Sequence, residues 1–365
     1  MTPRVAVVHE RFTDYAGSER VVEQLVRIWP TADVYVPLAD PAHVPPGIDP
    51  ARLRTSGLQS LYRGGGRYAH LLPLLPVAMT RFDLSGYDLV VTSHHAFANR
   101  VRPPSGTPVL SYTHSPARWV WEPGMRAGEA GAVGGAGLAA FAASQRAADR
   151  RAAQRVTALV ANSTAVAERI HRWWGRPSTV VPPPVAVDFY TPDRSVPRED
   201  FFLLAGRLVP YKRPEVAAAA ARAAGVPLVV VGSGRAAAQV REAGGRGVRL
   251  LGRVPDDELR DLYRRCRALV MPGEEDFGIV PVEAQACGAP VLALRAGGAL
   301  DSVLPGATGV LYDEQEGASA VEALAGALRD FPVAGFDPDR VRAHAESFSP
   351  ERFRTRIADL AAALL

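Results

Sequence analysis

Two glutamates, Glu275 and Glu283, stand with seven residues between them in the stretch ALVMPGEEDFGIVPVEAQACG. The apolar run at residues 268–271 is typical of a buried parallel strand, and Pro272 and Gly273 end it. The acidic loop that follows therefore leaves the carboxyl edge of a sheet, where ligands bind in α/β folds. There, each carboxylate could accept hydrogen bonds from a pair of sugar hydroxyls.

A short helix is expected directly after this loop. Pro281 suits its first turn and Gly288 its end, which predicts a helix over residues 282–287. Backbone amides at a helix start favour an anion, and a phosphate is expected on those of Phe277, Gly278, Ile279 and Val280. This arrangement suits a sugar nucleotide. The alternative is a solvated acidic loop followed by a glutamate that only stabilises the helix dipole.

The loop GRLVPYKRPE contains Lys212, the only lysine beside 41 arginines. A compact ammonium can fit between phosphate oxygens where a guanidinium cannot replace it. We therefore expect Lys212 to contact a phosphate, and Arg207 in the same loop could bind two phosphate oxygens at once. The alternative is that this lysine survives by chance.

Glycines follow two further apolar runs. Gly232 opens the sequence Gly-Ser-Gly after VPLVVV, and Gly297 and Gly298 follow LALRA. Such turns allow a phosphate to approach the backbone. A full dinucleotide-binding fingerprint needs a third glycine where Ala237 stands, so the pattern disfavours a nicotinamide-dependent dehydrogenase.

Polar residues also follow the apolar runs of the N-terminal half. Gly17 lies between RVAVVHE and a helix expected over residues 18–29, where glycine lets a ligand come close. His94, His95 and His114 end two more expected strands and could contact a ligand there. No carboxylate or third histidine has the spacing of a zinc site, so we expect no metal.

The 365 residues are 47% hydrophobic with a net charge of +4, which indicates a globular protein of about two domains. Cys266 and Cys287 are the only cysteines, which predicts a reducing, cytoplasmic setting. We expect neither a signal peptide nor a membrane-spanning helix. Residues 1–180 have a net charge of +7 and the remainder a net charge of −3. This asymmetry suggests that the N-terminal half meets an anionic surface or acceptor. The alternative is that high arginine usage reflects genomic base composition.

Apolar runs alternate with helical patterns along most of the chain, which predicts an α/β fold with parallel sheets. Three prolines at residues 182–184 indicate a stiff connector and a domain boundary. The glycine-rich run at residues 126–140 is expected to be a mobile lid or loop. Residues 51–82 break the alternation with five arginines among apolar residues, which predicts either an interfacial helix or acceptor groove, or a helical hairpin packed on the core.

The motif order in the C-terminal half resembles that of the retaining family 4 glycosyltransferases. The motifs are GRLVPYK, Gly-Ser-Gly, Glu275 and Glu283, EAQACG, and the paired glycines that follow. The resemblance is strong over residues 200–312 and looser in the N-terminal half, where it rests on Gly17 and SYTHSP. It implies an α/β GT-B fold, in which two Rossmann-like domains face a central cleft.

The resemblance also implies where the domains lie. An acceptor-binding domain would span residues 1–183, and a nucleotide-sugar-binding domain residues 184–347. The terminal helix at residues 348–365 would cross back to the first domain.

Roles for five residues of the second domain follow from the resemblance. Arg207 and Lys212 resemble the pair that binds the diphosphate. Glu275 resembles the carboxylate on the donor sugar, and Glu283 the one on the ribose. Val254 resembles the position whose backbone meets the base.

In the first domain, Gly17 resembles a glycine beside the diphosphate, and His114 a histidine that contacts the transferred sugar. The chain departs from the family pattern twice. It has YAGS where consecutive glycines are common, and Asp301 where a glutamate often follows the paired glycines. These departures bear on the N-terminal and phosphate contacts.

The stretch EEDFGIVPVEAQACG is most similar to mannosyltransferases that use GDP-mannose, and a UDP-sugar is the alternative donor. The resemblance implies transfer with retention of configuration by a front-face mechanism without metal or cofactor. The acceptor would be a glycan, a lipid-linked molecule or a small molecule. Peripheral membrane contact on the cytoplasmic side is one expectation, and no nucleic acid is expected as a partner.

Two further alternatives stay open at the level of sequence. A nucleotide-sugar 2-epimerase shares the two-domain architecture but needs other acid and base residues. A non-catalytic subunit that binds sugar nucleotides is disfavoured, because the motif set is complete.

Overall fold

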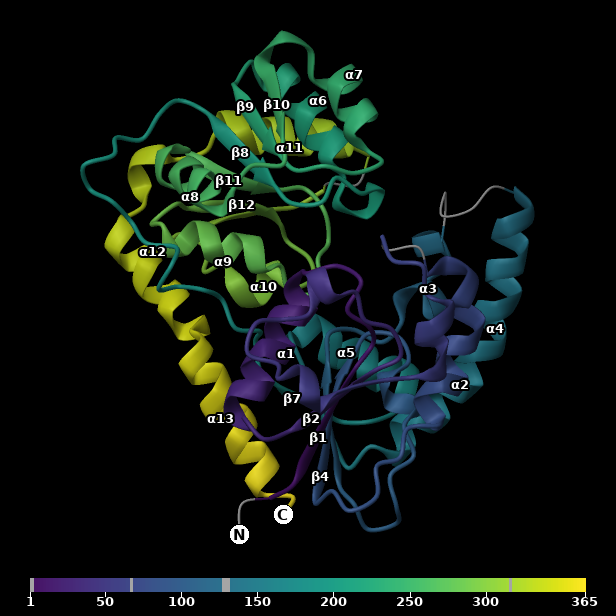
Figure 1. Ribbon diagram of the computed structural model, residues 1–365. Helices are drawn as coiled ribbons and strands as arrows, with labels where there is room; N and C mark the ends of the chain where they lie inside the picture. Colours follow the sequence, from purple (N-terminus) through teal and green to yellow (C-terminus); the bar gives the residue numbers. More distant parts are fainter. Residues whose placement is uncertain (1–2, 66–67, 127–131, 315–316) are drawn as a thin grey trace. The chain divides into compact units, whose positions relative to one another are not determined.

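The structure, a computed structural model, divides into two compact units (Figure 1). The N-terminal unit comprises Met1–Pro184 together with Glu351–Leu365, and the C-terminal unit comprises Val185–Pro350. The structure describes residues 3–65, 68–126, 132–314 and 317–365.

The N-terminal unit is built on a seven-stranded sheet of order β3-β2-β1-β4-β5-β6-β7, in which all neighbouring strands are parallel. The central strands are buried, as expected where helices cover both faces of a parallel sheet. The strand order reverses between β1 and β4, which makes their carboxyl ends a topological switch point. The strands are β1 (Val5–His9), β2 (Asp33–Val36), β3 (Leu53–Thr55), β4 (Leu89–His94), β5 (Val109–Thr113), β6 (Ala158–Ala161) and β7 (Thr179–Val180).

Six α-helices belong to this unit: α1 (Gly17–Ile28), α2 (Leu75–Thr80), α3 (Arg118–Trp121), α4 (Ala132–Arg155), α5 (Thr164–Trp174) and α13 (Pro350–Ala362), counted over the described residues. The start of α5 is fixed by the Ser163 hydroxyl, which accepts a hydrogen bond from the Val166 amide, and left-handed Gly175 ends the helix. Phe353 and Ile357 of α13 are buried in the same apolar cluster as β1, so the end of the chain completes the core of its first unit.

The C-terminal unit has a six-stranded, all-parallel sheet of order β10-β9-β8-β11-β12-β13. Its switch point lies between β8 and β11. The strands are β8 (Phe202–Ala205), β9 (Leu228–Val231), β10 (Val248–Gly252), β11 (Ala268–Met271), β12 (Val291–Leu294) and β13 (Gly309–Tyr312). Each unit is thus Rossmann-like, which confirms the predicted α/β class.

The helices of the C-terminal unit are α6 (Pro214–Ala224), α7 (Ala237–Gly244), α8 (Asp256–Arg265), α9 (Ile279–Ala286), α10 (Ala299–Ser302), α11 (Ala320–Arg329) and α12 (Pro338–Ala345). At the start of α11, the Ser319 hydroxyl accepts from the Glu322 amide while the Glu322 carboxylate accepts from the Ser319 amide. The helix predicted over residues 282–287 is α9, which begins three residues earlier than expected.

Two expectations about the N-terminal unit are wrong. Residues 51–82 do not form a helical hairpin, because Leu53–Thr55 is the edge strand β3, followed by short 3₁₀ turns and then α2. Pairing of β3 with β2 is a tertiary contact, which a local amphipathic pattern does not reveal. The glycine-rich run is not a loop from residue 132 onward, because its alanines continue into α4. Residues 127–131 of that run lie outside the described part.

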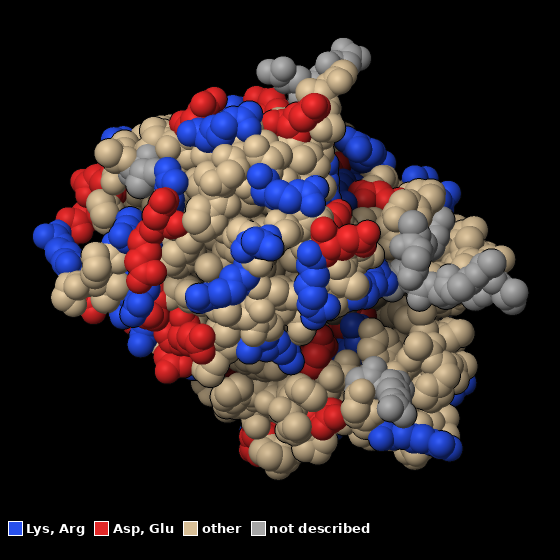
Figure 2. All heavy atoms as spheres, turned by 90° about the horizontal axis from the view of Figure 1, so that it is seen from above, with Lys and Arg blue, Asp and Glu red and all other residues tan. Residues whose placement is uncertain are grey.

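Among the described residues, every helix is too short or too polar to traverse a bilayer. On the face shown in Figure 2, basic and acidic side chains are interspersed, so the surplus of arginine forms no continuous basic surface there.

Candidate functional site

Two loops of the C-terminal unit meet because β8 and β11 are neighbours in the sheet. The loop after β8 carries Arg207 and the 3₁₀ turn η7 (Pro210–Lys212), and the loop after β11 carries Glu275. Lys212 Nζ lies 2.6 Å from Glu275 Oε1. Residues 63 positions apart in the chain therefore form one ion pair at the carboxyl edge of the sheet.

Arg207, Lys212 and Glu275 line one small pocket between these loops. Arg207 is exposed, while the side chains of Lys212 and Glu275 are only 21% and 15% exposed. Burial on its own would lower the pKa of Lys212, but the adjacent Glu275 carboxylate outweighs it and raises that pKa above 10.5. The pocket thus combines two cations with one carboxylate acceptor, which suits a ligand that has both anionic and hydroxyl groups.

Glycines hold these loops close together. Gly232 has a φ of 133°, and a Cβ placed on it would lie 1.8 Å from the carbonyl oxygen of Gly206. A Cβ on Gly273 would lie 2.6 Å from the Cα of Lys212. Only glycine fits at either position, so the approach of one protein loop to another already accounts for both residues. Contact between Gly232 and a donor stays a prediction.

The paired glycines after β12 act in the same way. A Cβ on Gly297 would lie 2.2 Å from the Glu275 carbonyl oxygen, and one on Gly298 2.2 Å from the Cα of Phe277. The Gly298 amide also donates to the Glu275 carbonyl over 2.9 Å. These glycines, predicted to approach a phosphate, thereby fix the backbone that presents Glu275.

The acidic loop ends at α9, whose N-cap is Gly278 with a φ of 81°. The Phe277 side chain is buried against the Phe348 ring, with the ring centroids 5.6 Å apart, so it serves the core. The amides of Ile279 and Val280 lie in the first turn, where backbone donors have no partner within the helix. This turn is the anion-favouring end expected from the sequence.

Glu283 lies one turn into α9 and is 5% exposed. Its Oε2 accepts a hydrogen bond of 3.1 Å from the hydroxyl of Tyr263 on α8. Burial raises the pKa of the Tyr263 hydroxyl, so this group stays a donor. The sequence did not mark Tyr263, since nothing in α8 alone shows that its hydroxyl reaches a carboxylate on another helix. Val254, between β10 and α8, is half-buried against the same core.

A second polar cluster lies at the carboxyl ends of β1, β4 and β5 in the N-terminal unit. Ser93 Oγ lies 3.0 Å from His9 Nδ1 and 2.8 Å from His114 Nε2. His9 Nε2 lies 3.1 Å from Glu19 Oε1 on α1. Gly17 begins α1 two residues before Glu19. The sequence singled out His114 but missed His9 and Ser93, although both stand at strand ends like His114.

The Glu10 carboxylate caps the neighbouring turn. It accepts hydrogen bonds from the amides of His95, Ala96, Phe97 and Ala98. Burial alone would raise its pKa, but the nearby histidines and the amide donors lower the pKa to about 2. His94, expected to contact a ligand, is instead buried against Trp174, with ring centroids 5.5 Å apart. Because successive side chains of a strand point to opposite faces of the sheet, His94 points away from the face that carries Ser93.

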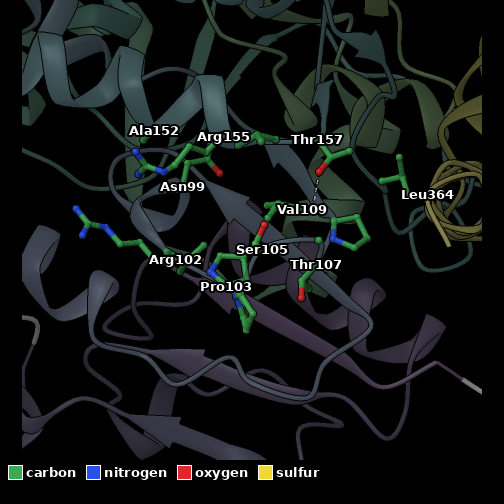
Figure 3. Close-up of a pocket in the computed structure, with 15 residues that line it drawn as sticks. Asn99, Arg102, Pro103, Ser105, Thr107, Val109, Ala152, Arg155, Thr157 and Leu364 are labelled. Carbon is green, nitrogen blue, oxygen red and sulfur yellow. Dashed lines mark hydrogen bonds between the residues drawn. The ribbon is translucent and has the colours of Figure 1, made fainter.

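A pocket of about 760 Å³ lies elsewhere in the N-terminal unit (Figure 3). It is lined by Arg102, Arg155, Thr157 and the start of β5 at Val109. It therefore occupies the amino edge of the sheet, whereas His114 follows the opposite end of β5. None of the site residues predicted from the sequence lines it.

Comparison with known families accounts for both units. Residues 15–189 match the family described as Glycosyltransferase Family 4, and residues 192–334 match the one described as Glycosyl transferases group 1. Both halves of the chain are thus similar to families of glycosyltransferases. A D-inositol 3-phosphate glycosyltransferase from Geodermatophilus obscurus is 36% identical in an alignment over 228 residues, with 53% of this chain and 50% of the relative covered.

A second relative is the D-inositol 3-phosphate glycosyltransferase 1 of Catenulispora acidiphila. It is 32% identical in an alignment over 280 residues, with 67% of this chain and 64% of the relative covered. The chain thus spans less than two thirds of the length of either relative.

Solved structures agree on the fold. HepE of Anabaena in complex with UDP has a TM-score of 0.65 at 18% identity, with 99% of this chain and 100% of that chain covered. Sucrose-phosphate synthase from Thermosynechococcus elongatus has a TM-score of 0.68 at 20% identity, with 99% of each chain covered. At such identities the likeness shows the GT-B fold of the chain and no more.

Proposed function

We propose that the chain transfers a hexosyl group from a nucleoside diphosphate sugar to an acceptor hydroxyl, with retention of configuration. The observation that carries this proposal is the pocket in which Arg207, Lys212 and Glu275 meet. Its two cations suit a diphosphate, and its carboxylate suits the hydroxyls of the attached sugar.

In the proposed reaction, the bond between the anomeric carbon and the diphosphate oxygen breaks while the acceptor oxygen bonds to that carbon from the same face. The acceptor proton passes to the departing diphosphate. Lys212 and Arg207 stabilise the charge that grows on the diphosphate, together with the amides at the start of α9. Glu275 orients the sugar. Its place beside Lys212 gives no reason to make it a nucleophile.

The remaining contacts are proposed from the motifs. Glu283, whose carboxylate also accepts from Tyr263, would accept from ribose hydroxyls. The backbone at Val254 would meet the base. In the N-terminal unit, Gly17 would lie beside the diphosphate, and His114 would contact the transferred sugar.

GDP-mannose is the donor proposed from the wording of the acidic segment, with a UDP-sugar as the second candidate. The second is favoured by a structural neighbour solved with UDP-glucose. For the acceptor, the names of the curated relatives favour a small phosphorylated polyol, which would also suit the basic N-terminal half. We propose a cytoplasmic location, with peripheral membrane contact where the acceptor is lipid-linked.

A thermal-shift screen against GDP-, UDP-, ADP- and dTDP-sugars tests the donor, because a ligand that binds the native state raises its apparent stability. We expect one nucleotide family to raise the Tm of the wild type and to have little effect on Lys212→Ala. The selected donor is then incubated alone. A 2-epimer as the product would identify an epimerase, and absence of any shift with all four families would contradict the proposal.

A further inference from the structure

The polar cluster of the N-terminal unit is a continuous chain of hydrogen bonds. It runs from Glu19 through His9 and Ser93 to His114, over distances of 3.1, 3.0 and 2.8 Å. His9 and Ser93 are fully buried, while His114 is partly exposed, so one end of the chain reaches the surface. His9 and Ser93 are register partners on β1 and β4, which places their side chains on the same face.

The direction of these hydrogen bonds can be worked out from Glu19. Burial alone would raise the pKa of Glu19, but its hydrogen bond with His9 helps to lower the pKa to about 2. The ionised carboxylate only accepts, and it also receives the Ser18 hydroxyl and the Ala16 amide. His9 Nε2 must therefore carry a hydrogen.

The directions of the other hydrogen bonds follow from this assignment. A His9 ring whose single hydrogen lies on Nε2 has a bare Nδ1, and this nitrogen accepts from the Ser93 hydroxyl. The Ser93 oxygen, having used its only hydrogen, accepts from His114 Nε2. That assigns the hydrogen of the His114 ring to Nε2 and leaves Nδ1 with a lone pair.

We infer that Glu19, His9 and Ser93 are positioning residues that hold His114 in the Nε2–H tautomer, so that Nδ1 accepts a hydrogen bond from a hydroxyl of the bound sugar. This inference rests on the proposed function, in which His114 contacts that sugar. The ligand group it selects is a hydrogen-bond donor, such as a hydroxyl, rather than a carboxylate or a phosphate oxygen.

The surroundings of His114 keep its ring neutral. Burial is the largest cause that lowers the pKa of His114 well below 6.5, against a smaller opposing effect of Glu19. His94 also disfavours the charged form, and the Tyr112 ring contacts the imidazole with centroids 5.2 Å apart. At about pH 7 the second ring nitrogen is therefore an acceptor and not a donor.

The test is to read the histidine tautomers by ¹⁵N NMR in protein labelled at histidine, at about pH 7, with the His114 signals identified by their loss in His114→Gln. We expect Nε2–H in the wild type. Glu19→Gln keeps the acceptor for the Ala16 amide but turns a donor toward His9 Nε2. Each hydrogen bond then reverses, and the His114 hydrogen should move to Nδ1. The value of kcat/KM should fall roughly 10- to 100-fold.

Ser93→Ala interrupts the series of hydrogen bonds without adding bulk, and it should give a mixture of both tautomers with a similar loss of kcat/KM. The matched control is Ser111→Ala on β5. Ser111 is a fully buried serine that bonds to Thr113 and takes no part in the hydrogen bonds from Glu19 to His114. It should leave the His114 tautomer unchanged.

An Nδ1–H tautomer in the wild type, which a doubly protonated His9 would produce, would overturn the inference. So would an unchanged tautomer in Glu19→Gln. If the tautomer reverses as expected but the wild type turns over no nucleotide sugar, the positioning chain stands and the proposed function fails.

Discussion

The ion pair between Lys212 and Glu275 joins two groups that a nucleotide sugar would engage separately. The diphosphate would attract the ammonium, and the sugar hydroxyls would donate to the carboxylate. Until a ligand binds, each partly buried charge compensates the other, which avoids the cost of a lone charge in this pocket.

Lys212→Ala should abolish most turnover while the fold persists. The lost charge stabilises the leaving diphosphate, for which about a 100- to 1000-fold fall in kcat is expected. A partly exposed pair contributes on the order of 1 kcal/mol or less to folding. The measurements are kcat and Tm. The control is Arg265→Ala, which removes an exposed ion pair with Glu199 from α8. Equal kcat in both variants would refute the phosphate role of Lys212.

Glu10, like Glu19, should make the stability of the N-terminal unit fall in acid. Its pKa falls from 4.5 to about 2 on folding, so its contribution is complete above pH 4.5 and is lost as pH drops toward 2. The contribution corresponds to about 3 kcal/mol. Urea unfolding at several pH values should show this loss in the wild type and in Glu351→Gln, an exposed control. Glu10→Gln should be destabilised at neutral pH and lose less stability in acid, because Glu19 still titrates there; a pH profile parallel to that of the wild type would contradict this.

For single residues, the sequence could predict which residues of the site matter but few of the contacts between them. The lone lysine and the spaced glutamates mark Lys212, Glu275 and Glu283. The pairing of the first two depends on the neighbourhood of β8 and β11, which only the sheet order reveals. The same holds for Ser93, whose importance comes from its register with β1.

Among the elements, the edge of the N-terminal sheet differs most from expectation. The turns after β3 expose Leu61 and Leu74, and α2 exposes Val77, while neighbouring Leu71 and Leu75 are buried. Arg52 and Arg54 do not point to a ligand, since they donate to the Thr31 carbonyl and to Asp33. Arg63 is exposed, and Arg67 lies outside the described residues.

The exposed apolar residues of this edge should contact an anionic bilayer or a lipid-linked acceptor. We expect the variant Leu61→Gln, Leu74→Gln, Arg63→Gln to bind anionic vesicles more weakly, or to raise KM for a lipid-linked acceptor, while donor binding is unchanged. Salt should weaken the wild-type interaction, because screening lengths fall to about 8–10 Å near physiological ionic strength. Leu304→Gln is the control, since Leu304 is 46% exposed and Leu74 is 45% exposed. Equal binding by the triple variant and the control would indicate that this edge of the N-terminal sheet has only a structural role.

Strands and helices with strong apolar patterns, such as β4, β11 and α5, could be predicted from the sequence. The edge strand β3 could not, since a three-residue strand gains its hydrogen bonds only from β2. The start of α4 could not either, because glycine disfavours a helix locally and the alanines around it decide the outcome.

For the molecule as a whole, activity should not depend on a divalent metal. Arg207 and Lys212 would supply positive charge where a cation would otherwise offset the diphosphate. Turnover should survive EDTA and stay unchanged on addition of magnesium or manganese. Loss of activity in EDTA that either metal restores would overturn this expectation.

The sequence could also predict the fold class of the whole chain, because two β-α series separated by prolines leave few other architectures. The donor base could not be predicted to the same depth. Backbone groups near Val254 are proposed to meet the base, and a backbone contact leaves little trace in residue types.

We propose that Glu275 binds the sugar while the cations bind the diphosphate. Calorimetric titration of Glu275→Gln measures this directly. Two ligands are compared, the nucleotide sugar chosen by the thermal-shift screen and the corresponding nucleoside diphosphate. We predict that the substitution weakens binding of the sugar nucleotide roughly 10-fold or more, or about 1.4 kcal/mol, and leaves the nucleoside diphosphate nearly unaffected. Equal affinity of wild type and variant for the sugar nucleotide, or an equal loss of affinity for both ligands, would show that Glu275 does not bind the sugar.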